Sequence, residues 1–310
     1  MRLGHLVLII VGFLIAAPPV TPTSVGAQES ATSFPRYDPL FEFGPLGSVR
    51  NMRASGMPVI PIFDGWIDNG DGTGDLCFGY KSLNLVERRE IPFGSDNFIE
   101  PANFDGVQPT FFLEVPQTGW HRHYCVFTVR VLQGSEPVYW TLKHNGYEYK
   151  TPGHTGSINY LLDNTWYPAD RGQDGQGGSI APVVEFLEPE GSEHVGRGEP
   201  GAKAGPVTVR VGTPLTLTIS VTQPYIAEYQ GDPKPFNIYW EKYQGPTGEV
   251  TFSESSMRLE GGDRVETKQA TTTATFAAPG EYVLLVQALQ SSFPSQCCWT
   301  TGYVEVTVLE

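Results

Sequence analysis

The chain has 310 residues and a formal net charge of −14, from 20 Lys and Arg against 34 Asp and Glu. Such an excess of negative charge repels phosphate backbones and argues against a nucleic-acid partner. Hydrophobic residues make up 40 % and aromatic residues 12 % of the chain, which excludes a wholly disordered protein. At roughly 150 residues per domain, the length suggests two domains.

The first thirty residues have the pattern of a targeting segment. Arg2 gives a positive start, Leu6 to Ala17 is an apolar run of twelve residues, and small residues follow at Val25-Gly26-Ala27. We therefore predict a signal peptide over residues 1–27, cleaved near Ala27, and a secreted or periplasmic protein. The run is shorter than the roughly 20 residues that span a bilayer, so we expect no stable membrane insertion.

After an N-terminal extension at residues 28–57, the pattern indicates β structure throughout. Short runs rich in Val, Thr, Tyr, Phe and Trp alternate with Gly, Pro, Asn and Asp clusters, which favours an all-β fold of two tandem β-sandwiches. For the first domain, residues 58–167, we predict strands at Val59–Ile67, Asp75–Lys81, Leu85–Ile91, Thr110–Val115, His123–Leu132, Val138–His144 and Tyr147–Thr151. Asn145-Gly146 predicts a tight hairpin turn, because both turn positions favour positive φ.

A polar, Gly-rich stretch at residues 168–179 predicts a linker before a second domain at residues 180–310. There, Leu and Ile at 215, 217 and 219 alternate with Thr and Ser, the pattern of a strand with one face in a core. Further strands are predicted at Ala181–Leu187, Phe236–Trp240, Ala270–Phe276, Tyr282–Ala288 and Tyr303–Val308. Glu188–Gly205 is interpreted as a long insertion, and the two domains are expected to be tethered without docking.

The second domain resembles a known family. The strings APVVEF, VRVGTPLTLTISVTQP, FNIYW, ATFAAPGEYVLLVQA and GYVEVTV are similar to the immunoglobulin-like and PKD-like domains of secreted bacterial proteins. The resemblance implies a Greek-key sandwich in which Trp240 is the tryptophan of strand C and Tyr282 forms the tyrosine corner. The family's disulfide between strands B and F is absent, so Leu217 or Ile219 would fill its place.

The first domain is similar to uncharacterised secreted bacterial proteins in which such a domain precedes an immunoglobulin-like one. The similarity is carried by the strings GWIDNGDGTGDLCFGYKSLN, IPFGSDNFIEP and GVQPTFF. This resemblance implies a domain order and no activity.

Four cysteines allow three complete pairings, and export favours their oxidation. Cys77 and Cys125 each fall within a predicted strand, so a bridge between them requires only that these strands are neighbours. Cys297 and Cys298 are adjacent in a loop before the last strand, and we interpret them as a vicinal pair. A structural staple, a redox switch or a rigid binding edge would each fit this loop.

Two patterns are weak candidates for a metal site. Asp68 and Asp71 lie in a run of carboxylates and Gly that superficially resembles a calcium loop, yet Ile67 stands where the first ligand is needed. A hairpin loop accounts for the same residues. His121 and His123 share one face of a predicted strand, which supplies two metal ligands and not a complete site.

No catalytic residue is assigned, because the sequence has no complete hydrolase, metalloprotease or phosphate-loop motif. Trp120 and Trp299 lie near Gly- or Ser-rich loops and are the candidates for exposed, ligand-binding aromatic residues. The sequence favours a non-catalytic exported protein that binds or scaffolds an unknown protein or glycan partner, with no cofactor. The alternatives are a carbohydrate-binding module and an exported hydrolase acting on glycans or depending on a metal.

Overall fold

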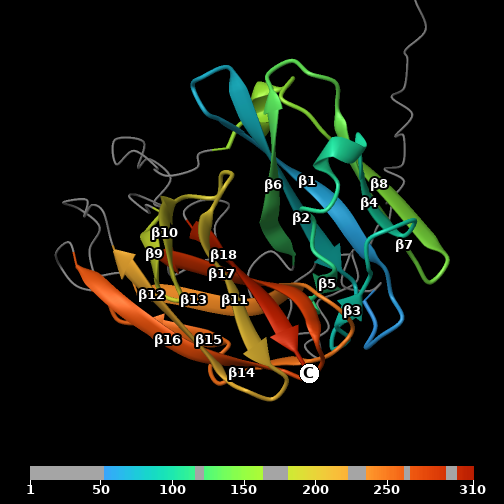
Figure 1. Ribbon diagram of the computed structural model, residues 1–310. Coiled ribbons are helices and arrows are strands. Elements are labelled where there is room, and N and C mark those ends of the chain that lie inside the picture. Colours follow the sequence, from blue (N-terminus) through green and yellow to red (C-terminus); the bar gives the residue numbers. More distant parts are fainter. Residues whose placement is uncertain (1–51, 116–121, 163–180, 223–234, 262–265, 291–298) are drawn as a thin grey trace, which may run out of the picture. The chain divides into compact units, whose positions relative to one another are not determined.

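The computed structural model describes residues 52–115, 122–162, 181–222, 235–261, 266–290 and 299–310 (Figure 1). The predicted signal peptide, most of the predicted extension and the predicted linker at 168–179 lie outside these residues. The described residues all belong to one compact unit, residues 51–310. No α-helix occurs in the described part of the chain, and the predicted all-β class is confirmed.

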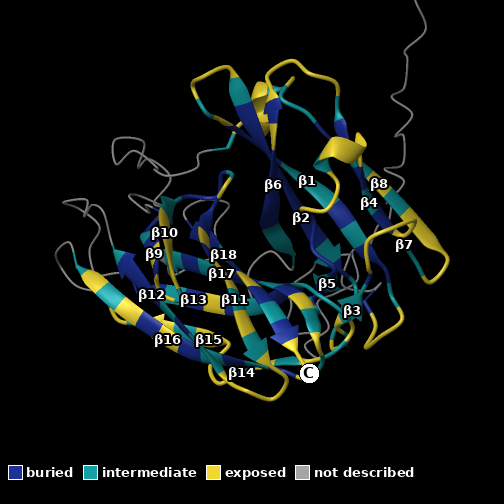
Figure 2. Cartoon of the chain, viewed as in Figure 1, coloured by how far each residue is buried: buried dark blue, intermediate teal, exposed yellow. Residues whose placement is uncertain are grey.

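The first part of the chain, residues 52–162, forms three small sheets. Its strands are β1 (Val59–Asp68), β2 (Thr73–Ser82), β3 (Arg89–Glu90), β4 (Asn97–Glu100), β5 (Phe111–Phe112), β6 (His123–Leu132), β7 (Val138–His144) and β8 (Tyr147–Gly153), with 3-10 turns at Ala102–Phe104 and Ile158–Tyr160. The sheet orders are β1-β2-β6, β4-β7-β8 and β3-β5. Phe78, Phe112 and Trp140 are fully buried between the sheets, with Phe112 stacked on Trp140 and Phe78 meeting Trp140 edge to face. Figure 2 shows how much of β2 and β6 this core buries.

The second part, residues 181–310, is one long sheet that curls over its own core. Its strands are β9 (Val183–Glu188), β10 (Glu190–Val195), β11 (Ala202–Arg210), β12 (Leu215–Thr222), β13 (Phe236–Gln244), β14 (Val250–Phe252), β15 (Ser256–Leu259), β16 (Thr267–Phe276), β17 (Gly280–Gln290) and β18 (Trp299–Leu309). The strand order is β14-β16-β12-β9-β10-β11-β18-β17-β13-β15. The sheet folds over between β9 and β11. As a result, β12 and β17 lie on opposite sides of one core, which is the arrangement of a β-sandwich.

The predicted hairpin at Asn145-Gly146 is confirmed. Asn145 has φ 50° and Gly146 has φ 77°, so both turn positions are left-handed as a type I′ turn requires. The turn sets the register of β7 against β8, with His144 opposite Tyr147 and Leu142 opposite Tyr149. The turn therefore decides which residue of β7 lies opposite each residue of β8.

Both structural residues predicted for the second domain have their expected positions. Trp240 is buried in the core on β13 and lies 6.4 Å from Phe186, ring centre to ring centre. The Tyr282 hydroxyl donates a 2.9 Å hydrogen bond to the carbonyl of Ala278, four residues upstream. This bond closes the corner that leads into β17, which is the hydrogen bond that a tyrosine corner requires.

Tyr282→Phe is expected to lower the free energy of unfolding by about 1–2 kcal/mol, because it removes this hydrogen bond and leaves the packed ring in place. The measurement is equilibrium denaturation in urea. Tyr239→Phe on neighbouring β13 is the control, because Tyr239 is exposed and should tolerate the change. A Tyr282→Phe variant as stable as the parent would count against a structural role for the corner.

Several predicted boundaries are wrong. Glu188–Gly205, interpreted as an insertion, contributes strand β10 and the start of β11, residues 202–205. The parallel pairing of β11 with β18 joins residues about a hundred positions apart, which local patterning does not report. Gly205 has φ 90°, and a Cβ there would overlap the carbonyl oxygen of Glu305, so glycine permits this close pairing. The predicted strands Leu85–Ile91 and Thr110–Val115 shrink to the two-residue β3 and β5, while β4, β14 and β15 were not predicted.

The two parts of the chain share apolar contacts, which corrects the expectation of a loose tether. β17 is buried on both faces: Leu284 and Val286 enter the core of the second part, whereas Leu285 packs into the core of the first. Tyr243 of β13 also lies in the first part's core, and its hydroxyl donates to the Val107 carbonyl. The division at residues 167 and 180 stays a prediction.

Candidate functional site

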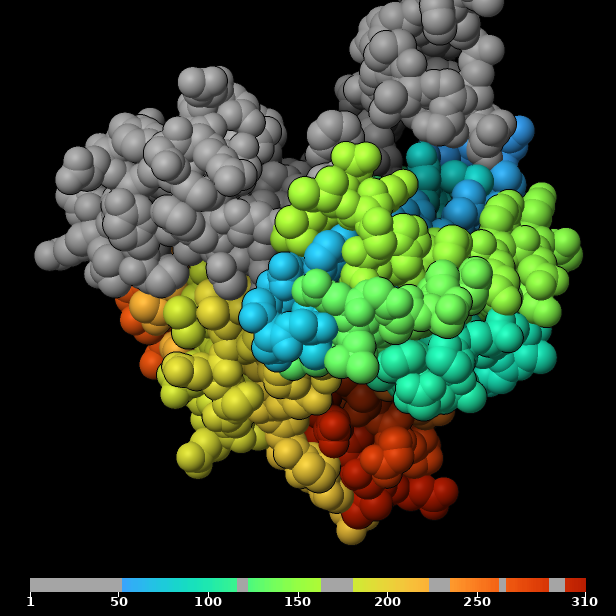
Figure 3. Space-filling view, turned by 90° about the horizontal axis from the view of Figure 1, so that it is seen from above, coloured from blue at the N-terminus to red at the C-terminus, as the bar shows by residue number. Residues whose placement is uncertain are grey.

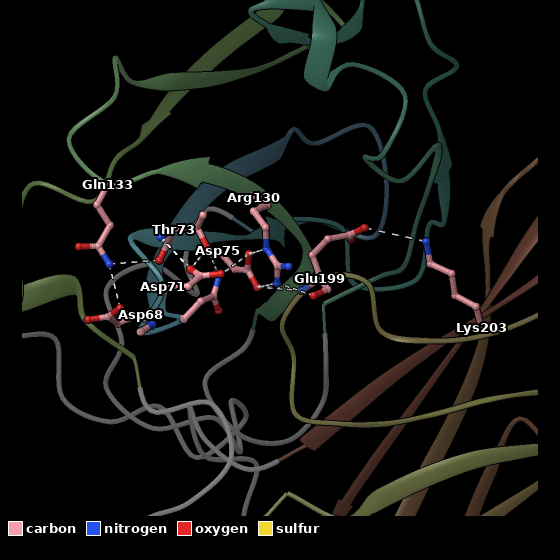
Figure 4. A network of polar contacts seen from close by, with 10 residues as sticks. Asp68, Asp71, Thr73, Asp75, Arg130, Gln133, Glu199 and Lys203 are labelled. Atoms are coloured by element: carbon pink, nitrogen blue, oxygen red, sulfur yellow. Dashed lines mark hydrogen bonds and ion pairs between the residues drawn. The ribbon is translucent and has the colours of Figure 1, made fainter.

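The candidate site is a set of buried charged groups around β2, beginning with Asp75. This carboxylate is fully buried and binds the Arg130 guanidinium in two hydrogen bonds of 2.7 and 2.8 Å. It also accepts the backbone N–H of Glu199 at 3.0 Å and the side-chain amide of Asn69 at 3.1 Å. Arg130 in turn donates to the Glu199 carbonyl at 2.6 Å, so one carboxylate joins β2, β6 and the segment before β11 (Figure 4).

Asp68 is the last residue of β1 and Asp71 lies in the turn of the β1–β2 hairpin, in line with the hairpin interpretation. Asp68 accepts the N–H of Gly70 and the side-chain amide of Gln133, both at 2.8 Å. Asp71 accepts the N–H of Thr73 at 2.9 Å and its hydroxyl, and these bonds hold the pKa of Asp71 below its usual value. Both carboxylates are thus used in the turn itself, which is the ordinary role of Asp in such loops.

A second buried ion pair joins the two parts of the chain at β13. Lys242 is 4 % exposed, and its ammonium group lies 2.7 Å from the carboxylate of Glu90 on β3. The same group donates to the carbonyls of Pro246 at 2.7 Å and Gly248 at 3.0 Å. All three ammonium protons therefore have acceptors, which is what a buried lysine requires.

The predicted bridge between Cys77 and Cys125 is present. Cys77 lies on β2 and Cys125 on the neighbouring β6, with their Cα atoms 4.9 Å apart. Cys125 has φ 42° and lies in an irregularity of the β2–β6 ladder, between the pairs Phe78–Phe127 and Tyr80–His123. This irregularity turns the Cys125 side chain toward Cys77, whose direct cross-strand partner is Thr128.

Asp64 supports the disulfide from the adjacent strand β1. Its carboxylate accepts the Cys125 N–H at 2.7 Å and lies 2.7 Å from the Arg122 guanidinium, with 4 % of the side chain exposed. Burial raises the pKa of Asp64 to about 6, while Arg122, the Cys125 N–H and Arg197 act in the opposite direction. A Cβ at Gly79 would overlap this carboxylate, so glycine at that position makes room for it.

His123 and Glu241 are two partly buried titratable residues that both interact electrostatically with Glu114 of the Arg88–Glu114 pair. The His123 ring stacks on Tyr80, with ring centres 4.5 Å apart, and its Nε2 lies 2.8 Å from the Glu114 carbonyl. Burial lowers the pKa of His123 to about 4. Burial raises the pKa of Glu241 to about 7, and Arg88 partly opposes this shift.

The opposite shifts of these groups predict how stability depends on pH. His123 is protonated in the unfolded chain below about pH 6.5 but neutral in the folded chain down to about pH 4, so it makes stability rise with pH across that window. Asp64 and Glu241 bind a proton more tightly when folded, so they make stability fall as the pH rises toward 6 and 7.

His123→Gln keeps a donor for the Glu114 carbonyl and removes the titration. As the pH rises from about 4.5 to 6.5, the free energy of unfolding of the variant should fall by about 2 kcal/mol relative to that of the parent, because the variant lacks the stabilisation that neutral His123 contributes at the higher pH. Urea denaturation at the two pH values measures this difference. His154→Gln, at a histidine outside this group, is the control and should follow the parent. Parallel pH profiles for His123→Gln and the parent would contradict the shifted histidine.

The other predicted site residues do not come together. Trp120, His121, Cys297 and Cys298 lie outside the described residues, so their predicted roles stay predictions. Trp299 is 7 % exposed and packs against the disulfide, with the Arg197 guanidinium 4.7 Å above its ring, so the predicted exposure is wrong. Within the described ranges, no group of three or more His, Cys, Asp and Glu residues is placed to hold a metal ion.

Sequence reasoning missed the buried ion pairs that carry this arrangement. Asp75 and Arg130 stand in predicted strands as single charged residues between apolar neighbours, and such a residue needs a partner when both faces of its strand are buried. Lys242 comes two residues after the predicted strand Phe236–Trp240, beside Glu241, so its sequence context did not mark it as buried. The pattern marks Asp75 and Arg130 as unusual, but it does not say which charges meet.

Comparisons with known proteins give fold-level similarity at most. No family model and no curated protein matches the chain. Similar solved structures include the ASH/PapD-like domain 7 of human CEP192, 10 % identical over 50 % of this chain and 96 % of that one, with a TM-score of 0.27. The D0-D1 domain of intimin is 12 % identical, and the match covers 81 % of this chain and 97 % of that one, with a TM-score of 0.21. The D00-D0 domain of intimin is 14 % identical, and the match covers 82 % of this chain and 100 % of that one, with a TM-score of 0.24. In the described part of the chain, no helix has the length and apolar character of a membrane span. The fold assignment therefore rests on the strand pairing described above.

Proposed function

We propose that this chain is a non-catalytic binding or scaffolding protein that is exported to the bacterial surface or the periplasm. The observation that carries the proposal is the use of its buried charged groups. Asp75 with Arg130, Glu90 with Lys242, and Asp64 with Arg122 each connect strands or join the two parts of the chain. A carboxylate that is held by main-chain N–H groups and a guanidinium serves rigidity and is not free to transfer a proton to a substrate.

The disulfide supports the export part of this proposal. A buried bridge between Cys77 and Cys125 forms and persists in oxidising compartments, whereas cytosolic thiols are kept reduced. The apolar leader predicted over residues 1–27 agrees with that compartment. A rigid two-part β protein outside the cytoplasm is suited to present a surface to a partner.

The export claim is tested by expressing the full chain in a bacterial host and separating its compartments. The exported protein should begin at Gln28 or within a few residues by intact-mass measurement, and thiol alkylation should find Cys77 and Cys125 oxidised. A chain without residues 1–27 is the matched control and should stay in the cytoplasm with both thiols free. A full-length chain that keeps Met1 would contradict the proposal.

The non-catalytic claim is tested with the exported protein and a panel of polysaccharides. We expect no release of reducing ends above background, and the same result for Asp64→Asn. Turnover in the parent that Asp64→Asn abolishes would instead support the exported hydrolase.

A further inference from the structure

Two tyrosines of strand β8 form an aromatic pair on an edge of the molecule. Tyr147 and Tyr149 are two residues apart, so their side chains lie on the same face of the strand. Their ring planes are within 15° of parallel and their centres are 6.3 Å apart. β8 is the edge strand of the sheet β4-β7-β8, and Figure 3 shows light-green atoms of this region of the chain at the surface.

The fold holds this pair in place. The Asn145-Gly146 turn fixes Tyr149 opposite Leu142, which is fully buried, and Tyr147 opposite His144 at the end of the hairpin. Tyr149 is therefore anchored beside the core, whereas Tyr147 is 42 % exposed. Aromatic side chains with two rotatable bonds lose little entropy on binding, so a fixed pair of rings is a preorganised surface.

These two rings differ from most other tyrosines of the described strands; exposed Tyr239 of β13 is the exception, but unlike the pair it has no stacked aromatic neighbour among the described residues. The hydroxyls of Tyr80, Tyr243, Tyr282 and Tyr303 are bonded to the backbone, which accounts for them as structural residues. The ring of Tyr139, on the neighbouring strand β7, is covered by the Lys150 ammonium at 4.6 Å. Among the described residues, Tyr147 and Tyr149 have neither a hydroxyl partner nor a covering cation.

We propose that Tyr147 and Tyr149 are a binding platform for a neutral polysaccharide chain, an inference that rests on the proposed binding function. The C–H faces of sugar rings pack on aromatic rings, and their hydroxyls bond to tyrosine hydroxyls and to main-chain groups at a sheet edge. Charge favours a neutral ligand. Lys143 pairs with Glu148 and Lys150 with Glu100, so the hairpin is locally balanced in a chain of net charge −14 that repels acidic polymers.

A peptide that adds a strand to β8 is the rival occupant of this edge. The strand carries Glu148, Lys150 and Pro152 on the face opposite the two rings, and charged residues and proline are the features that protect an edge from strand addition. The aromatic pair contributes nothing to such main-chain pairing. The observations therefore favour the polysaccharide.

The test measures binding of the exported full chain to insoluble cellulose and chitin by depletion from solution, with anionic alginate beads as the charge control. The parent should bind at least one of the two neutral polymers and not alginate. Tyr147→Ala and Tyr149→Ala should each raise the Kd about tenfold or more, and Tyr147→Phe about threefold or less. Tyr239→Ala is the matched control, because Tyr239 is 46 % exposed on another sheet, and it should bind as the parent does.

Thermal unfolding of each variant separates binding from folding. Because Tyr147 is exposed, its variants should unfold at the parent's temperature, and they decide the question even if Tyr149→Ala is unstable. A parent that binds neither neutral polymer, or Tyr147→Ala and Tyr149→Ala variants that bind like the parent, would overturn the platform. An unchanged Kd in Tyr147→Ala and Tyr149→Ala is also the result expected if a peptide strand, and not a polysaccharide, binds this edge. None of these results bears on export or on catalysis, which the preceding experiments test separately.

Discussion

Removing the disulfide is expected to lower the free energy of unfolding by about 4 kcal/mol in a Cys77→Ala/Cys125→Ala variant. The bridge joins residues 48 positions apart, and in the chain-entropy model a loop of this length restricts the unfolded chain by about that amount. Both sulfurs are buried, so alanine introduces no unpaired polar atom at either position. Equilibrium denaturation in guanidinium chloride measures the change.

Reductant provides the control for this experiment. Dithiothreitol should destabilise the parent by a similar amount and should have a smaller effect on the double variant, in which the Cys77–Cys125 bridge is already absent. Asp64 stays buried beside Arg122 in both proteins, so the comparison isolates the bridge. A double variant within about 1 kcal/mol of the parent would show that the bridge contributes little to stability.

Asp75→Ala should have the next largest effect, a loss of about 2–3 kcal/mol. The substitution leaves the Glu199 N–H and the Asn69 amide without their acceptor, and each unsatisfied buried donor costs about 1–3 kcal/mol. The Arg130 side chain is 44 % exposed and regains water, so the loss falls below that of breaking a fully buried pair. Urea denaturation gives the size of the loss.

Hydrogen exchange locates the same effect. The Glu199 N–H should lose its protection in Asp75→Ala, because its acceptor is the Asp75 carboxylate. Glu100→Ala is the matched control: it breaks the exposed pair with Lys150 and should change stability by less than about 0.5 kcal/mol. If Asp75→Ala were no more destabilising than Glu100→Ala, the network in Figure 4 would not hold the two parts together.

The sequence by itself determined the position of several long strands. The bounds predicted for β6 and β7 agree with the structure, and β12 contains the alternating residues 215, 217 and 219, because runs of β-branched and aromatic residues between turn residues define such strands locally. The hairpin at Asn145-Gly146 followed for the same reason, since it depends on two adjacent residues. The corner at Tyr282 was implied by the resemblance to immunoglobulin-like domains, and its hydrogen bond reaches only four residues upstream. The Cys77–Cys125 pairing was predicted on the condition that the two strands are neighbours, and the pairing of β2 with β6 meets this condition.

The tertiary structure decided how the two parts meet and which charges pair. The partners of Asp75 are far away in the sequence: Arg130 is 55 positions from it, and the Glu199 N–H is 124 positions from it. No local sequence pattern indicates either pairing. The run from Tyr282 to Val286 is apolar without alternation, which is typical of a strand buried on both faces, yet it does not name the surface that covers the second face. Trp299 is buried for the same reason, because the disulfide and Arg197 that pack against it come from distant strands and loops. Periodicity reports how a strand faces its surroundings, whereas the surroundings themselves are fixed when distant segments pack together.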